Sequence, residues 1–249
     1  MTTTSAAMSG REVPPAVITP DGNFDKKRPT LNLLNGAGGI EQGMDWIIAT
    51  AKSDVAPEQE DVQDMLDFYT SKDVKVVIPQ ADAFSYCTDW VSSPEDGYFK
   101  DPQKWETFPT KELPGTLEAH IGGNGKRDIA GMSMSATSSL LLAEHNPGFY
   151  NAVGSFSGCA ATSRPLQRLS TQLIHSPGRQ PRRRLGRSDV GRYGQRVQRV
   201  QRRVGQYHPE EFGPPETYIS VNSGLGGAND WGAPVFPRCW LKAVSSRPQ

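Results

Sequence analysis

Short apolar runs alternate with amphipathic stretches along the first half of the chain. Strands are predicted over residues 13–19 and 28–34, a helix over 59–69 and a further strand over 74–79. The run at 28–34 has little polar alternation, which is typical of a parallel strand covered on both faces. Strands that alternate with helices at this spacing predict an α/β fold with a mostly parallel central sheet.

The predicted alternation of strands and helices continues to residue 158. A helix is predicted over 105–119, with Pro114 as a kink or break, and GGNGKR then forms a loop before a strand that ends near residue 132. A helix over 138–144 and a strand within FYNAVGSFSG complete the order. This succession is typical of the α/β-hydrolase plan.

The stretch DIAGMSMSATSS carries the strongest chemical signal, because small residues surround Ser133 between a strand and a helix. Such a nucleophile elbow places a serine hydroxyl at the tip of a tight turn, beside the next backbone N–H. Ser133 is therefore the predicted nucleophile. Ser135 replaces the last glycine of G-x-S-x-G but is still small. By itself, the motif is also compatible with an ordinary strand-to-helix connection.

Two loops follow predicted strands at their carboxyl ends, where open α/β sheets bind ligands. The first, Asn35 to Gly39, is rich in glycine and can bring backbone amides close to a ligand. The second contains Tyr86, Asp89 and Trp90, which either contact substrate or anchor the loop. No G-x-G-x-x-G or G-K-[ST] motif follows these strands, so no nucleotide cofactor is expected; no metal site is expected either.

Charge is unevenly distributed, although the chain has 27 basic and 27 acidic residues. Residues 164–209 contain twelve Arg, no Lys and one acid, a net charge of +11. Tyr193 and Tyr207 are the only aromatic residues there, so nucleic-acid binding would be unspecific phosphate attraction. We expect no specific nucleic-acid partner.

Targeting and redox signals are weak. No apolar run is long enough for a transmembrane segment, and the N-terminal residues lack a basic region followed by an apolar one, so no secretory signal is expected in this sequence. Three cysteines, Cys87, Cys159 and Cys239, define no disulfide framework. Cys87 and Cys159 are either bridged or two separate buried thiols.

Several ordered motifs resemble one family, the mycolyltransferases of the antigen 85 type, especially their corynebacterial and related actinomycete members. They are LNLLNGAGG, SYCTDW, KWETFPTKELPGTLEAH, IAGMSMSATSSLLLAEHNPGFYNAVGSFSGC and ETYISVNSGLGGANDWG. The likeness covers residues 5–163 and 211–232. It implies a secreted, cell-wall α/β-hydrolase that moves a mycolyl group between trehalose mycolates or onto arabinogalactan through an acyl-serine intermediate.

The resemblance also implies roles for individual residues. Ser133 matches the family nucleophile, and Ala37 and Met134 match the residues whose backbone N–H groups form the oxyanion hole. Asn35 stands where many relatives have an aspartate that contacts trehalose. Asp89 and Trp90 belong to the predicted substrate loop.

The likeness is interrupted twice, which divides the chain into four segments. Residues 1–163 form the hydrolase core with the elbow, 164–210 are an Arg-rich segment predicted to be disordered, 211–232 are family-like, and 233–249 are an atypical tail. Loss, recovery and second loss of likeness is the pattern expected of a truncated sequence translated partly in another reading frame. The C-terminal part of the fold is therefore predicted to be incomplete.

This interruption removes the family motifs that carry the general base and its acid. His145 is predicted about 18 Å from the start of its helix, too far to reach the Ser133 hydroxyl. His175 and His208 lie in the Arg-rich segment. Besides an acyltransferase, the sequence is compatible with a generic serine carboxylesterase or with a noncatalytic carbohydrate- or lipid-binding relic.

Overall fold

The computed structural model describes residues 2–42, 45–47, 65–90, 93, 99, 101–158 and 216–220. In chain order its elements are β1 (Thr3–Ser5), β2 (Arg11–Val13), β3 (Pro15–Ile18), β4 (Arg28–Leu34), η1 (Ile40–Gln42), α2 (Met65–Thr70), β5 (Lys75–Pro79), η2 (Phe108–Glu112), η3 (Pro114–Glu118), α3 (Ala119–Ile121), β6 (Gly123–Met132), α4 (Met134–His145), β7 (Ala152–Phe156) and β8 (Glu216–Ser220).

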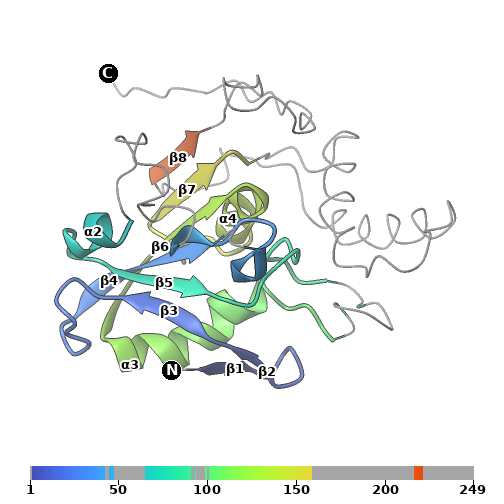
Figure 1. Cartoon of the computed structure of the whole chain (residues 1–249), viewed down its shortest axis with the longest axis horizontal. Helices are drawn as coiled ribbons and strands as arrows, with labels where there is room; N and C mark the ends of the chain where they lie inside the picture. Colours follow the sequence, from blue (N-terminus) through green and yellow to red (C-terminus); the bar gives the residue numbers. More distant parts are fainter. Residues whose placement is uncertain are drawn as a thin grey trace, which may run out of the picture.

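Six strands form one sheet in the order β3-β5-β4-β6-β7-β8 (Figure 1). β3 is antiparallel to β5, and all other neighbouring pairs are parallel. The strands β1 and β2 form a separate antiparallel pair. The predicted α/β fold with a mostly parallel sheet is confirmed.

Apolar side chains cover both faces of this sheet. On one face Leu34, Val77 and Ile129 pack with α4 and with the helical segment 108–121. On the other face Leu33, Val76, Ile78 and Ala130 pack with Trp46, Ile47 and Tyr69. Successive residues of β4 and β5 thus point to opposite layers, which explains why their sequences are apolar without alternation.

The predicted helix over 105–119 is helical through Pro114 rather than broken there. η2 and η3 are π-helical, and Leu113, between them, keeps helical dihedrals of −63° and −42°. Its N–H donates to the Phe108 carbonyl five residues earlier. Proline removes one donor of an α-helical ladder, and the wider π register accommodates this loss within a continuous segment.

Three predicted boundaries were wrong. GGNGKR belongs largely to β6 rather than to a loop, because Gly123 and Arg127 pair with β4. The strand predicted over 13–19 is divided at Pro14 between β2 and β3, which belong to different sheets. The helix after the elbow begins at Met134 and not at Ser138.

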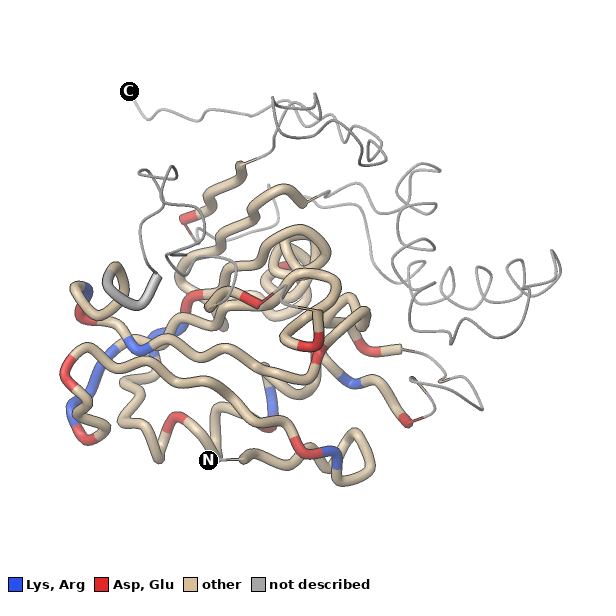
Figure 2. Tube along the Cα trace, in the orientation of Figure 1, with Lys and Arg blue, Asp and Glu red and all other residues tan. Residues whose placement is uncertain are grey.

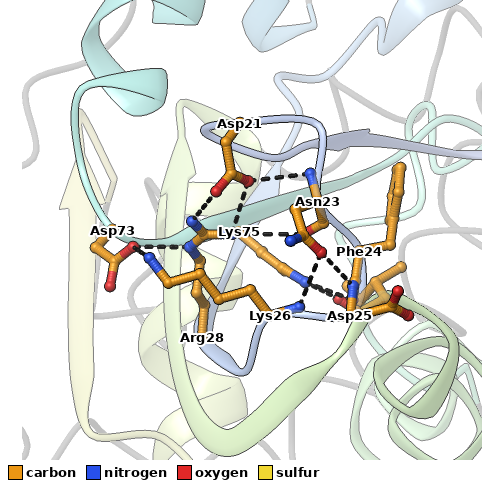
Figure 3. A network of polar contacts seen from close by, with 9 residues as sticks. Asp21, Asn23, Phe24, Asp25, Lys26, Arg28, Asp73 and Lys75 are labelled. Atoms are coloured by element: carbon orange, nitrogen blue, oxygen red, sulfur yellow. Dashed lines mark hydrogen bonds and ion pairs between the residues drawn. The ribbon is translucent and has the colours of Figure 1, made fainter.

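Charged residues stabilise the amino end of the sheet. Arg28 is 2% exposed and bonds Asp21 at 2.6 Å and Asp73 at 2.7 Å, and Lys26 also bonds Asp73 (Figure 3). Lys75 is fully buried and donates to the backbone carbonyls of Phe24 and Ile121. Figure 2 shows several Lys and Arg residues at this end of the molecule.

Some sequence predictions concern residues outside the described ranges. These are the Arg-rich segment 164–210, the tail 233–249, and Cys159, Cys239, His175 and His208. Within the family-like segment 211–232 the structure describes β8, which pairs in parallel with β7. No helix in the described ranges has the length and apolar character needed to cross a membrane.

Candidate active site

Ser133 lies at the tip of the turn between β6 and α4, at the carboxyl end of the sheet. Its side chain is exposed, whereas the residues of α4 that follow are buried through Ala143. Its dihedrals are 57° and −115°, a left-handed conformation that strains a residue with a side chain by about 1–3 kcal/mol. Its backbone N–H donates to the Phe156 carbonyl at 2.9 Å. This is the geometry of a nucleophile elbow.

Ser133 is also the N-cap residue of α4, yet its side chain forms no capping hydrogen bond. A serine at this position usually caps its helix by accepting a bond from a backbone N–H. Here the backbone conformation presents the hydroxyl at the surface instead.

Glycine is required at Gly131 because the backbone of α4 approaches β6 very closely. A Cβ atom at this position would lie 2.2 Å from the Ser135 carbonyl oxygen and 2.8 Å from the Ala136 nitrogen. Ser135, at the fifth motif position, is fully buried, and its hydroxyl lies 2.7 Å from the Leu34 carbonyl oxygen. A serine is therefore accommodated where the strict motif has glycine.

The two candidate oxyanion-hole residues lie on the segments that meet at the elbow. Leu34 pairs with Gly131 in the sheet, so the loop that contains Ala37 begins beside the end of β6. Met134 is the first residue of α4, where a backbone N–H has no acceptor within its own helix. The positive end of the α4 dipole also favours negative charge here.

The loop at 84–87 contacts Ala37 and Met134. The sequence patterns did not predict these contacts. The Phe84 N–H donates to the Ala37 carbonyl at 2.7 Å, and the Tyr86 N–H donates to the Met134 sulfur at 3.3 Å. Ser138 donates to the Tyr86 carbonyl. Phe84, Tyr86 and Cys87 all have positive φ without being glycine. No local sequence signal marks such a conformation, because contacts with distant segments maintain it.

Asn35 is fully buried beneath this loop. Its amide donates to the Pro79 carbonyl at 2.6 Å and to the Asp82 carboxylate at 3.3 Å, and its oxygen accepts from the Trp46 N–H. Asn35 thus connects the ends of β4 and β5. Its sugar-binding role stays a prediction.

Asp82 and Cys87 form a buried pair beside Asn35. The free Cys87 thiol lies 3.3 Å from the Asp82 carboxylate. Burial raises the pKa of Asp82, and burial together with the charge of Asp82 raises the pKa of the Cys87 thiol well above its usual value. A thiol with a raised pKa is a poor nucleophile, so this pair acts as a structural contact rather than a reactive group.

Asp89 and Trp90 have contacts typical of anchors. Asp89 accepts hydrogen bonds from the N–H groups of Glu106 and Thr107 and from the Thr107 hydroxyl. Trp90 is 5% exposed, packs against Phe99 and donates to the Ser85 carbonyl. These contacts fit the anchoring alternative, and substrate contact stays a prediction for both residues.

The two described histidines lie away from the elbow. His145 occupies the opposite end of α4, where its ring nitrogen is 3.1 Å from Glu106, and this hydrogen bond raises its pKa. His120 is in α3, before β6 begins. Within the described ranges no group of three or more His, Cys, Asp or Glu is arranged to hold a metal ion.

Comparison with known proteins places the chain in a family. Residues 5–230 match the model of the Esterase family, and the chain belongs to that family. The structure of Mycobacterium tuberculosis MPT51 aligns with a TM-score of 0.55 and covers 93% of this chain and 92% of its own. At 17% identity this likeness supports the fold alone, and the fold is of the α/β-hydrolase type.

Curated relatives include mycolyltransferases. The chain is 30% identical over 148 residues to diacylglycerol acyltransferase/mycolyltransferase Ag85A of Mycobacterium tuberculosis, covering 59% of this chain and 39% of the relative. It is 29% identical over 148 residues to the Ag85B protein of Mycobacterium leprae, covering 59% and 40%. The chain thus spans about two fifths of the length of these relatives. The resemblance found in the sequence motifs is confirmed.

Proposed function

We propose that this protein is a serine acyltransferase that moves a mycolyl group between trehalose mycolates or onto cell-wall arabinogalactan at the cell envelope. The Ser133 hydroxyl would attack the carbonyl carbon of the donor ester, and the donor sugar would leave as a free alcohol that takes up the serine proton. The acceptor sugar hydroxyl would then attack the acyl-serine, form the new ester and return its proton to Ser133. The exposed, left-handed Ser133 between β6 and α4 carries this proposal. The Ag85 relatives are named as acyltransferases and mycolyltransferases, which supports the transfer of a mycolyl group.

The proposed oxyanion hole consists of the backbone N–H groups of Ala37 and Met134. The tetrahedral intermediate develops negative charge on the former carbonyl oxygen, and preorganised donors stabilise that charge by a few kcal/mol. The α4 terminus adds to this stabilisation. No metal or cofactor is needed for this step.

A generic serine carboxylesterase is the second candidate, because the matching family model is that of the esterases. The two candidates differ in the acceptor, which is a sugar hydroxyl in one case and water in the other. Incubation with trehalose monomycolate and with a short p-nitrophenyl ester, in the presence and absence of free trehalose, separates them. Sugar ester as the main product indicates transfer, and free acid alone indicates hydrolysis.

The test of the serine chemistry is titration of the purified full chain with a fluorophosphonate probe beside Ser133→Ala. Only an activated serine reacts rapidly with this probe. Both described histidines lie away from Ser133, so the proposal requires a base from another part of the chain, and we expect stoichiometric labelling that the substitution abolishes. Ser157→Ala is the matched control, because Ser157 is also exposed, has φ of 61° and follows the neighbouring strand β7. A folded wild-type chain that does not label would overturn the proposed function and favour a binding relic.

A further inference from the structure

The Ser135 hydroxyl joins two strands beneath the elbow. It lies 2.7 Å from the Leu34 carbonyl oxygen, and the Met132 N–H donates to it at 3.1 Å. One hydroxyl has one proton and two acceptor sites, so Ser135 donates to Leu34 and accepts from Met132 at the same time. Ser135 is fully buried, which protects both bonds from exchange with water.

Both partners adjoin the proposed reacting groups. Met132 ends β6 directly before Ser133, and Leu34 ends β4 three residues before Ala37. We propose that Ser135 is a positioning residue that sets the distance between the Ser133 hydroxyl and the Ala37 backbone N–H. This inference rests on the proposed function of Ser133 and concerns the same site.

The loss of this hydroxyl would alter geometry more than stability. The Leu34 carbonyl also accepts a hydrogen bond from the Trp46 indole at 2.7 Å, so it stays paired without Ser135. The penalty for an unpaired buried acceptor is therefore avoided at Leu34. The Met132 N–H loses its bond to Ser135, but Met132 is only half-buried. Acyl transfer is more sensitive, because a shift of about 1 Å in reacting groups can lower a rate by about a hundredfold.

Ser139 provides a matched control in the same helix. It is fully buried, and its hydroxyl donates to a distant backbone carbonyl, that of Gly154 in β7, at 2.8 Å. It lies one helical turn further from the elbow and contacts neither β4 nor Met132 through any hydrogen bond that the described residues show. If buried serine hydroxyls in α4 have only a structural role, Ser135→Ala and Ser139→Ala should change the labelling rate and the melting temperature to the same extent.

The experiment uses the purified full chain and three variants, Ser133→Ala, Ser135→Ala and Ser139→Ala. The rate constant for fluorophosphonate labelling, kcat and KM for p-nitrophenyl butyrate, and the melting temperature are measured for each. We expect Ser135→Ala to lower the labelling rate and kcat by about tenfold with KM unchanged. Ser139→Ala should keep the wild-type rates, while the melting temperatures of the two variants agree closely.

The outcomes separate the inference from the proposed function. If wild-type protein labels and Ser135→Ala labels equally fast, or if Ser139→Ala is slowed as much, the positioning role is wrong and the proposed function stands. If folded wild-type protein does not label, both are wrong. Should Ser135→Ala fail to fold, Ser135→Gly takes its place, because glycine occupies this position in the strict motif and has no hydroxyl. A labelling rate equal to wild type in Ser135→Gly would then overturn the positioning role.

Discussion

At the amino end of the sheet, charged side chains pair with one another, whereas at the carboxyl end backbone groups and small hydroxyls maintain the loops. Arg28 and its carboxylates stabilise the amino end (Figure 3). Ser133 lies at the other end, after the last residue of β6. The seven residues of β4 extend about 23 Å between these regions.

The difference lies in where the backbone is strained. Six described non-glycine residues have positive φ, and four of them, Phe84, Tyr86, Cys87 and Ser133, are in the segments that form the candidate site. Strain of this kind persists only where surrounding contacts over-determine it, and it clusters at functional sites. We therefore expect substitutions at the carboxyl end to affect chemistry and those at the amino end to affect stability alone.

The largest effect is expected at Ser133 itself. Ser133→Ala and Ser133→Gly should both lower probe labelling at least a thousandfold, because the proposed nucleophile is absent. Only glycine relieves the left-handed strain, so Ser133→Gly should be more stable than Ser133→Ala by about 1 kcal/mol. Urea unfolding measures this difference. Equal free energies of unfolding would mean that φ of 57° is not strained here.

Gly131→Ala should disturb both stability and labelling. Its Cβ would meet backbone atoms of Ser135 and Ala136, which cannot move without displacing the start of α4. We expect destabilisation by about 1–3 kcal/mol and a labelling rate at least tenfold lower.

The control for this variant is Gly115→Ala, in the exposed helical segment η3. A Cβ atom there meets nothing within 4 Å. Alanine is the better helix former, so this variant should be more stable by about 0.5–1 kcal/mol and should label normally. Normal labelling of Gly131→Ala as well would contradict the close approach at the elbow.

Arg28→Lys tests the opposite end. Lysine keeps the charge but cannot bond Asp21 and Asp73 through the separate nitrogens that a planar guanidinium provides. We expect a melting temperature lower by a few degrees and an unchanged labelling rate. A slower labelling rate in the folded variant would show that the two ends are coupled.

The smallest effects are expected in the pH dependence of stability, with opposite signs at the two ends. Hydrogen bonds from Arg28 lower the pKa of Asp21 and Asp73, so their contribution is present above the unfolded pKa of about 4 and is lost as pH falls below it. Burial raises the pKa of Asp82, so its ionisation lowers stability as pH rises above about 4.

Two asparagine variants separate these contributions. Asp21→Asn should reduce the loss of stability on acidification, and Asp82→Asn should reduce the loss between pH 4 and neutrality. Thermal unfolding across pH 3 to 8 measures both slopes. A steeper acid slope in Asp21→Asn would show that Arg28 does not favour the ionised carboxylate.

The local sequence was sufficient to predict the central strands and the elbow. β4 occupies the predicted residues 28–34, and β5 begins one residue later than predicted, because runs of apolar residues form strands wherever both faces are covered. The elbow was recognisable because Gly131 and the small residues around Ser133 permit a tight turn. These features depend on neighbours in the chain.

Contacts between distant residues decided the remainder. Ser135 is 101 positions from Leu34 in the sequence, and Arg28 is 45 positions from Asp73. Tyr86 is 48 positions from Met134, whose sulfur accepts its N–H. Pro114 likewise lies within a continuous helical segment, where the sequence alone predicted a kink or break. The sequence by itself determined the fold class and the place of Ser133 between a strand and a helix. Only the tertiary structure assigned the hydrogen-bond partners of the buried polar groups. Such groups must be paired, but the local sequence does not specify which distant group is the partner.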